Sequence, residues 1–192
     1  LLDAVASIEG KFRLRFMTSH PKDFGEDVVE VMEKHRKICR LVHLPVQSGS
    51  DAVLKAMNRR YTSGKYLSEI ELLKMRLPEA EVTTDIIVGF PGETEADYLA
   101  TEELVKKADF ASAFTFVFSG TKAASMEGQI SEDVQKDRIM RLVELVNSLT
   151  RKKSEKYVGR TVEILCEDYD EKKGLYLGRD EFGRMGYFGS ER

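Results

Sequence analysis

Short apolar runs alternate with amphipathic segments along most of the chain. Phe12, Leu14 and Phe16 alternate with Arg13, Arg15 and Met17, and this period of two predicts a strand. Mainly apolar runs predict three further strands, at 41–46, 82–90 and 113–118. Four strands are therefore expected before the pattern changes near the C-terminus.

Amphipathic segments separate the predicted strands. Helical spacing of apolar side chains predicts helices at 26–35, from Asp51 onward, after Thr62, at 94–107 and at 134–149. Thr94 and Asp97 have the spacing of a capping box. Strands separated by helices of this length are joined by right-handed parallel crossovers. The pattern predicts an α/β fold, part of a parallel βα barrel, with an open doubly wound sheet as the alternative.

The pattern of apolar and polar residues changes from about Tyr157. Residues 162–166 alternate, and short strand-like pieces follow at 175–177 and 185–188, separated by glycines. Short strand-like segments separated by glycines predict part of a small antiparallel β-barrel. We place the domain boundary between residues 156 and 157. From residue 157 onward the chain is slightly acidic, with six Lys or Arg residues against eight Asp or Glu residues.

Strand parity predicts that the sheet has a polar face. Successive side chains of a strand point to opposite faces, so Thr83, Asp85 and Ile87 oppose their apolar neighbours. A carboxylate is costly to bury without a partner, so we expect Asp85 to pair with Arg13 or Arg15 inside the sheet. A barrel interior that binds a polar cofactor would have such a face. The alternative is that Asp85 has only a structural role, in which its ion pair with an arginine links neighbouring strands.

The strand predicted at 113–118 carries three phenylalanines on one parity. We expect Phe114 and Phe116 to pack beneath helices, which leaves Thr115 on the polar face. Under this assignment, every predicted strand has one apolar face and one face with polar groups.

Two glycine-centred turns are the most informative segments, His43-Leu-Pro-Val-Gln-Ser-Gly-Ser-Asp51 and Thr83-Thr-Asp-Ile-Ile-Val-Gly-Phe-Pro-Gly-Glu-Thr94. Each follows a predicted strand and leads into a predicted helix, so both belong at the carboxyl edge of a parallel sheet. Backbone amides at such helix starts can bind an anion or a ribose, although a plain N-cap has the same sequence pattern. His20, after the first predicted strand, is a candidate acid or base; a hydrogen-bonded structural histidine is the alternative.

Composition limits the possible functions. The net charge is −3, so overall charge gives no support for nucleic-acid binding. Cys39 and Cys166 lack Cys-x-x-Cys spacing, and two thiols alone cannot ligate an iron–sulfur cluster. We therefore expect reduced, packed thiols in a cytoplasmic protein, without a metal site. No apolar run reaches the ~18 residues of a membrane span, so no membrane association is predicted.

Four segments together resemble the radical S-adenosylmethionine methylthiotransferases, most closely the tRNA (MiaB-type) branch. They are Arg13-x-Arg-Phe-x-Thr-Ser-His-Pro-Lys-Asp-Phe24, the turn at 43–51, Met57-Asn-Arg-Arg-Tyr-Thr62 and Thr84-Asp-Ile-Ile-Val-Gly-Phe-Pro-Gly-Glu-Thr94. Relatives that act on a ribosomal protein typically read Pro-Leu-Gln-His where this chain has Pro-Val-Gln-Ser. The segment Tyr157-Val-Gly-Arg-Thr-Val-Glu-Ile-Leu165 resembles the start of a TRAM module, the family's RNA-contacting β-barrel.

This resemblance implies that the complete enzyme attaches a methylthio group to C2 of isopentenyl-adenosine beside the tRNA anticodon. It implies radical chemistry with S-adenosylmethionine and two [4Fe–4S] clusters. The family's cluster-binding cysteine motifs do not occur in this chain, which is expected to be an inactive C-terminal fragment cut at both ends. The alternatives are a methylthiotransferase for another tRNA adenosine or a ribosomal protein, a non-catalytic RNA-binding βα scaffold, and a phosphate-binding βα enzyme. The sulfur donor and the reductase are not identified.

The resemblance also assigns site residues. Four residues are expected to contact S-adenosylmethionine: Gln47, Ser48, Asp85 and Ile87. Polar groups would hold the ribose and the amino-acid moiety, and Ile87 would pack near the adenine. Ser19 and His20 are expected to face the reaction centre, whereas Glu93 is expected to brace its turn.

Two further expectations concern RNA contact and assembly. Where the family usually has Ser-x-Arg-x-Gly-Thr, this chain has Ser119-Gly-Thr121, so an arginine that could contact RNA is absent. A partial barrel leaves an unpaired strand edge, through which the chain is expected to dimerise.

Overall fold

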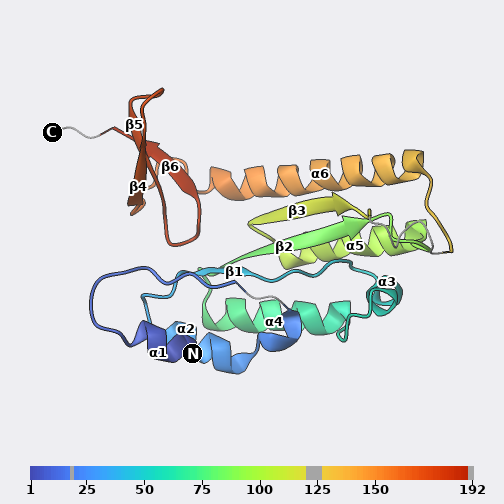
Figure 1. Cartoon of the computed structure of the whole chain (residues 1–192), viewed down its shortest axis with the longest axis horizontal. Helices are drawn as coiled ribbons and strands as arrows, with labels where there is room; N and C mark the ends of the chain where they lie inside the picture. The colour runs from blue at the N-terminus through green and yellow to red at the C-terminus, as the bar shows by residue number, and fades with distance from the viewer. Residues whose placement is uncertain (18–19, 120–126, 190–192) are drawn as a thin grey trace.

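A parallel sheet and a small antiparallel sheet form the scaffold (Figure 1). The computed structural model describes residues 1–17, 20–119 and 127–189. The parallel sheet has the order β1 (Leu41–His43), β2 (Glu81–Val88) and β3 (Ser112–Val117). The antiparallel sheet has the order β4 (Leu165–Asp170), β5 (Leu175–Arg179) and β6 (Met185–Phe188). The predicted α/β fold, with a parallel sheet followed by an antiparallel β-module, is confirmed.

Helices alternate with the parallel strands. They are α1 (Leu2–Ala6), the 3-10 helix η1 (Pro21–Asp23), α2 (Glu26–Lys34), α3 (Asp51–Ala56), α4 (Ser63–Arg76), α5 (Glu95–Ala108) and α6 (Glu132–Glu155). The capping box at the start of α5 is confirmed, because Thr94 and Asp97 satisfy each other's backbone N–H groups. Among the helices in the described ranges, none is long and apolar enough to cross a bilayer.

The helices cover one face of the parallel sheet. Val82, Ile86 and Val88 of β2 are fully buried on that face. The hydroxyl of Tyr66, on α4, donates a 2.7 Å hydrogen bond to the carbonyl oxygen of Leu44 and so ties this helix to the sheet. The long helix α6 packs against β3. Burial of this apolar face is the main source of stability for the sheet.

The strand β1 is shorter than predicted. Its ladder with β2 covers Leu41 to His43, and the N–H of Leu44 adds one 2.8 Å bond to the oxygen of Thr83. Pro45 has no N–H to donate, so the ladder is interrupted there. Pairing with β2 resumes at Gln47, in a single bridge.

The strand predicted at residues 12–17 is wrong as a regular strand. Within it, Leu14 makes one parallel bridge, to Ile38. The N–H of Leu14 donates to the oxygen of Lys37 at 2.7 Å, and the N–H of Cys39 donates to the oxygen of Leu14 at 2.8 Å. The segment is therefore extended and lies beside the residues that lead into β1, but it does not form a ladder.

Two arginines of this extended segment hold the β-module. Arg13 donates to the oxygen of Arg179 at 2.6 Å and pairs with the Glu163 carboxylate at 2.8 Å. Arg15 pairs with Glu167 at 3.2 Å. Figure 1 shows the module beyond the last turn of α6, at the opposite end of the molecule from α3. The module thus lies near the amino ends of the parallel strands.

The predicted facing of the phenylalanines on β3 is wrong. Ladder partners share a face of a sheet, and Phe114 pairs with Asp85 while Phe116 pairs with Ile87. Phe114 and Phe116 are 59% and 50% exposed, because the helices cover the opposite face. Strand parity separates two faces correctly, but it does not tell which face the helices cover.

Candidate functional site

The two glycine-centred turns lie at one edge of the parallel sheet. One follows β1 and the other follows β2, and these strands run parallel. The Ser50 hydroxyl donates a 2.5 Å hydrogen bond to Oδ1 of Asp97, in the first turn of α5. The N–H of Gly49 donates to the Thr101 hydroxyl on the same helix at 2.9 Å. The turns therefore form one continuous rim at the carboxyl ends of the strands.

Gln47 joins the two strands at this rim. Its N–H donates to the oxygen of Asp85, and its oxygen accepts from the N–H of Ile87, both at 2.9 Å. Its φ of 72° lies in the left-handed region, which non-glycine residues adopt only where surrounding bonds hold them. Three of the predicted cofactor-binding residues are thus adjacent: Gln47, Asp85 and Ile87.

Asp85 belongs to a short polar chain on the open face of the sheet. Its Oδ2 lies 3.5 Å from Nε2 of His43, and Nδ1 of His43 lies 2.9 Å from the Thr83 hydroxyl. The side chains of Asp85 and His43 are 28% and 14% exposed. The predicted ion pair of Asp85 with Arg13 or Arg15 is wrong, because both arginines reach carboxylates of the β-module instead.

Ser48 is fully buried beneath α5. Its hydroxyl lies 3.4 Å from the Thr101 hydroxyl and accepts from the N–H of Ser50 at 3.2 Å. The neighbouring Gly49 approaches α5 so closely that a Cβ would lie 2.5 Å from the oxygen of Ala100. The Ser48 hydroxyl therefore holds the turn against the helix and does not point out of the rim.

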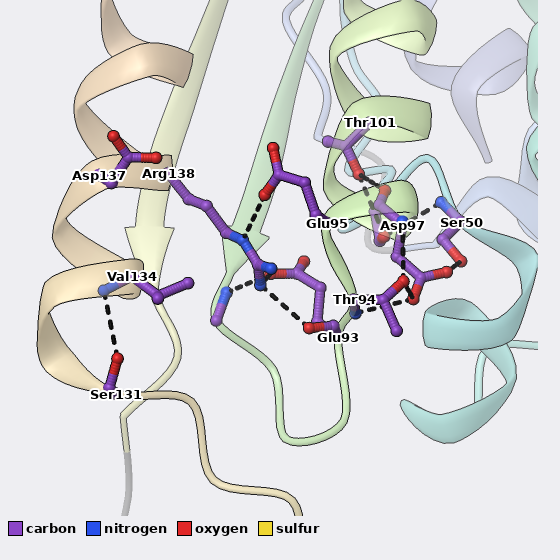
Figure 2. Close-up of polar contacts among 12 residues, drawn as sticks. Ser50, Glu93, Thr94, Glu95, Asp97, Thr101, Ser131, Val134, Asp137 and Arg138 are labelled. Atoms are coloured by element: carbon purple, nitrogen blue, oxygen red, sulfur yellow. Dashed lines mark hydrogen bonds and ion pairs between the residues drawn. The ribbon is translucent and has the colours of Figure 1, made fainter.

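The second turn is braced by a buried ion pair, which Figure 2 shows between the turn and α6. Oε2 of Glu93 accepts from the N–H of Gly89 and from Nη1 of Arg138, both at 2.8 Å. Burial raises the pKa of Glu93, and the bonds from Gly89 and Arg138 act against this rise. The expected bracing role of Glu93 is confirmed.

Sequence reasoning missed Arg138 as the partner of Glu93. Arg138 stands four residues before Leu142 and eight before Val146, so it lies on the apolar stripe of α6, and it is 4% exposed. A charged residue on such a stripe needs a buried partner. That position is the signal from which the pairing could have been suspected, although its partner is distant in the sequence.

His20 lies just before η1, close to the rim. Its Nδ1 accepts from the N–H of Lys22 at 3.2 Å, and its ring meets the edge of Tyr61 at a centroid distance of 5.2 Å. The Tyr61 hydroxyl donates to the oxygen of Val46 at 3.0 Å. Burial, followed by the charges of Arg59 and Lys22, lowers the pKa of His20. Ser19 lies outside the described residues, as do residues 120–126.

The cysteines do not provide a cluster site within the described chain. Cys39 is buried and Cys166 is exposed, so the expectation of two packed thiols is wrong for Cys166. Among the residues that the structure describes, no three histidine, cysteine or acidic side chains gather in a way that could hold a metal ion. The family's iron–sulfur clusters therefore do not fit this segment.

The rim does fit S-adenosylmethionine chemically. The carboxylate of Asp85 is an acceptor for ammonium or ribose hydroxyl groups, and the Gln47 side chain supplies both donors and acceptors. Ile87 adds an apolar surface on the same face of β2 as Asp85, and the N–H of Ile87 donates to the oxygen of Gln47. A polar and charged ligand with an aromatic base requires this combination of groups.

Comparison with known proteins agrees with this geometry. Residues 1–105 match the model of the Radical SAM superfamily. Among solved structures, coproporphyrinogen III oxidase (HemN) from Escherichia coli, a radical SAM enzyme, superposes with a TM-score of 0.60 over 92% of this chain and 40% of its own. At 14% identity this likeness concerns the fold alone.

Curated relatives match nearly the whole chain. Proteins named tRNA-2-methylthio-N(6)-dimethylallyladenosine synthase are 47% identical in Caldicellulosiruptor saccharolyticus, 49% in Clostridium botulinum and 44% in Fusobacterium nucleatum. The alignments cover 96–98% of this chain but only 40–44% of the relatives, so the chain spans less than half their length. With a family model that covers more than half of its residues, the chain belongs to the radical SAM superfamily.

Proposed function

We propose that the whole protein is a tRNA methylthiotransferase, which adds a methylthio group to C2 of a prenylated adenosine beside the anticodon. The observation that carries the proposal is the identity of 44–49% with relatives named for this product, along 96–98% of the chain. The rim adds chemical support, because Asp85 and Ile87 share a face of β2 and the backbone of Gln47 is bonded to both, at the edge where βα enzymes place their active sites.

Within this function, the rim residues bind and orient S-adenosylmethionine. Asp85 accepts hydrogen bonds from its amino or ribose groups, and His43 holds the carboxylate at 3.5 Å. Gln47 supplies a side-chain amide beside it, and Ile87 packs against the adenine. Ser48 contributes by fixing the turn, since its hydroxyl is already engaged with Thr101.

The chemistry itself requires groups that this segment does not hold. Bound S-adenosylmethionine and a reduced cluster supply the hydrogen-abstracting radical chemistry for which the superfamily is named. The residues described above position a ligand, exclude water beneath the two turns and keep the rim rigid through the Glu93–Arg138 pair. Ser19 and His20 are proposed to face the reaction centre.

The β-module is proposed to contact the tRNA, and the boundary between residues 156 and 157 remains part of this proposal. Dimerisation through the open edge of the sheet is a further proposal, which scattering in solution can test. A tRNA-modifying protein is expected to work in the cytoplasm.

The direct test is methylthio transfer by the whole protein. The protein is reconstituted anaerobically with iron and sulfide and incubated with S-adenosylmethionine, a reductant and tRNA that carries isopentenyl-adenosine. Mass spectrometry of the digested nucleosides is expected to show the methylthio derivative of this nucleoside. Modification of an unprenylated adenosine or of a ribosomal protein would show that the proposed substrate is wrong.

A further inference from the structure

A buried glutamate stands at each end of β2, and each one pairs with a cation of α6. Oε2 of Glu81, the first residue of β2, lies 2.5 Å from Nζ of Lys153, and the two side chains are 8% and 13% exposed. Beyond the other end of the strand, Glu93 pairs with Arg138 (Figure 2). Both cations belong to one continuous helix, so the two pairs fix the position of α6 along the sheet.

Lys153 is also bound to the end of α5. Its Nζ donates to the carbonyl oxygen of Asp109 at 2.7 Å and to Oδ2 of the same residue at 3.1 Å. Asp109 is the residue at which α5 ends. Lys153 therefore keeps an acidic partner when Glu81 is replaced, and such a replacement does not leave the lysine as an unpaired buried charge.

Glu81 reaches the β-module through Tyr157, which follows the end of α6. The Tyr157 hydroxyl donates to Oε1 of Glu81 at 3.3 Å. The Arg184 guanidinium lies over the same ring, 3.5 Å from its centroid, and pairs with Asp180 at 2.6 Å. Asp180 and Arg184 belong to the turn that joins β5 to β6. One carboxylate thus connects the start of β2 with the end of α6 and with the module.

The covalent connection between α6 and β4 constrains the module little. Residues 158–163 are all exposed and belong to no helix or strand. Within this connection, Gly159 has a φ of 79°, and no atom lies within 4 Å of the place where its Cβ would be. A segment with so few packed side chains does not by itself fix the orientation of the parts that it joins.

Noncovalent contacts therefore set the position of the module. Gly183 lies so close to Leu41 that an added Cβ would meet its Cδ2 at 2.5 Å. The ion pairs of Arg13 and Arg15 act beside this contact, but Glu163, the partner of Arg13, is 92% exposed. The ion pair of Glu81 with Lys153 is more buried than either of these pairs, and solvent screens it less.

We propose that Glu81 is a positioning residue for the tRNA substrate, which acts by fixing the end of α6 and, through Tyr157, the β-module. The inference rests on the proposed function, in which the rim carries the reaction and the module contacts the tRNA. A substrate that touches two surfaces gains affinity from the second only where their separation matches its own span. The pairs at the two ends of β2 hold the rim and the module to one helix and so fix this separation.

The test measures methylthio transfer by the whole protein, with the concentration of tRNA varied. Glu81→Ala is expected to raise KM for tRNA at least about fivefold and to leave kcat within about twofold, because the lost contact binds the ground state and the transition state equally. The affinity for S-adenosylmethionine should not change, since the variant leaves the rim intact. Small-angle scattering of this chain should show a larger radius of gyration.

Glu69→Ala is the matched control. Glu69 is 7% exposed, against 6% for Glu81, and it also pairs with a lysine, but Lys65 lies on the same helix α4. Its KM should stay within about twofold of the unchanged protein.

Tyr157→Phe is a milder variant, which removes one hydroxyl and keeps the ring beneath Arg184. It should raise KM in the same direction as Glu81→Ala. The double variant should be no worse than Glu81→Ala alone, because the hydroxyl then has no carboxylate to bind.

Equal KM values for Glu81→Ala, Glu69→Ala and the unchanged protein would overturn the proposal. A loss of kcat or of S-adenosylmethionine affinity at an unchanged KM would also overturn it, because Glu81 would then act on the rim. An unchanged radius of gyration would show that Glu81 does not fix the module. Absence of methylthio transfer by the unchanged protein contradicts the proposed function alone, since the Kd of the same variants for tRNA still decides the role of Glu81.

Discussion

Glu93, in the turn after β2, and Arg138, in the middle of α6, form an ion pair almost completely removed from water. Nη1 and Oε2 lie 2.8 Å apart, and the side chains are 5% exposed for Arg138 and 1% for Glu93. The same Arg138 nitrogen donates to the Glu93 carbonyl oxygen at 3.0 Å. The pair joins the longest helix to the rim. A partner left alone there would be an uncompensated buried charge.

Arg138→Met is therefore expected to lower the free energy of unfolding by about 3–5 kcal/mol, measured by urea denaturation. Arg151→Met is the control on the same helix, because the Arg151–Glu155 pair has side chains that are 85% and 64% exposed. The control should change stability by less than about 0.5 kcal/mol. Equal stability of the two variants would show that the buried pair does not hold the rim.

The turn after β1 depends on a glycine that carries no side chain against α5. In Gly49→Ala, the new Cβ would lie 2.5 Å from the backbone of Ala100 and Thr101, so the turn or the helix must move. We expect a loss of about 1–3 kcal/mol, as for other overpacked sites. Gly64→Ala, where a Cβ would lie 4.0 Å from the Thr62 hydroxyl oxygen, is expected to gain about 0.4–1 kcal/mol of stability. Thermal unfolding of both variants compares the two effects, and similar melting temperatures would contradict this packing.

His20 is expected to titrate below its ordinary pKa of about 6.5, because burial and then the charges of Arg59 and Lys22 disfavour its protonated form. The chemical shift of its ring protons against pH gives the midpoint. Arg59→Gln should raise the midpoint only part of the way towards the ordinary pKa, since burial is the larger cause of its lowering. A midpoint at or above 6.5 would contradict the observed packing against Tyr61.

The same shift predicts a pH dependence of stability. With the folded pKa below the unfolded value, the unfolded chain binds the proton first as the pH falls through about 6.5. The contribution of neutral His20 is thus present at higher pH and is lost as the pH falls. The stability difference between the unchanged chain and His20→Gln should therefore shift against the unchanged chain between pH 7 and pH 5.5. A constant difference over this interval would contradict the direction of the shift.

The β-module is expected to depend on Arg13 and Arg15 for its position. Replacing both with glutamine removes the ion pairs with Glu163 and Glu167, so small-angle scattering should show a larger radius of gyration. Arg36→Gln, a control whose side chain is 68% exposed, should leave the radius unchanged. An unchanged radius in the double variant would contradict this prediction. It would show that the contacts of Tyr157 with Glu81 and of Gly183 with Leu41 hold the module without these ion pairs.

The periodicity of the sequence was enough to predict the scaffold. The helical and strand periodicity predicts the positions of β2, β3 and the main helices. Because the strands are parallel, both glycine-centred turns must then lie at the carboxyl edge of the sheet. Local chemistry also explains why β1 stops early, since Pro45 cannot donate to the ladder. The capping residues Thr94 and Asp97 were predictable because their bonds are made within one turn of helix.

Long-range partners were not predictable in this way. Strand parity predicts that Arg13 and Arg15 share the face of Asp85, whereas their carboxylate partners lie in a module far along the chain. Phe114 was expected beneath helices because an apolar ring usually marks a covered face. Its exposure reflects the packing of the core against the opposite face of β3, where Ala113 and Val117 lie. The partners of these arginines and the exposure of Phe114 depend on tertiary packing, which the alternation of residues along a strand does not reveal.

The central claim is that Gln47, Asp85 and Ile87 bind S-adenosylmethionine, and its most direct test is the affinity of the whole protein for this ligand. Asp85→Asn keeps the shape of the side chain but removes its charge, and is expected to weaken binding at least about tenfold, as for a lost charged hydrogen bond. Asp133→Asn, on the exposed first turn of α6, is the control and should bind as tightly as the unchanged protein. Equal affinity of the two variants in calorimetry would contradict the account.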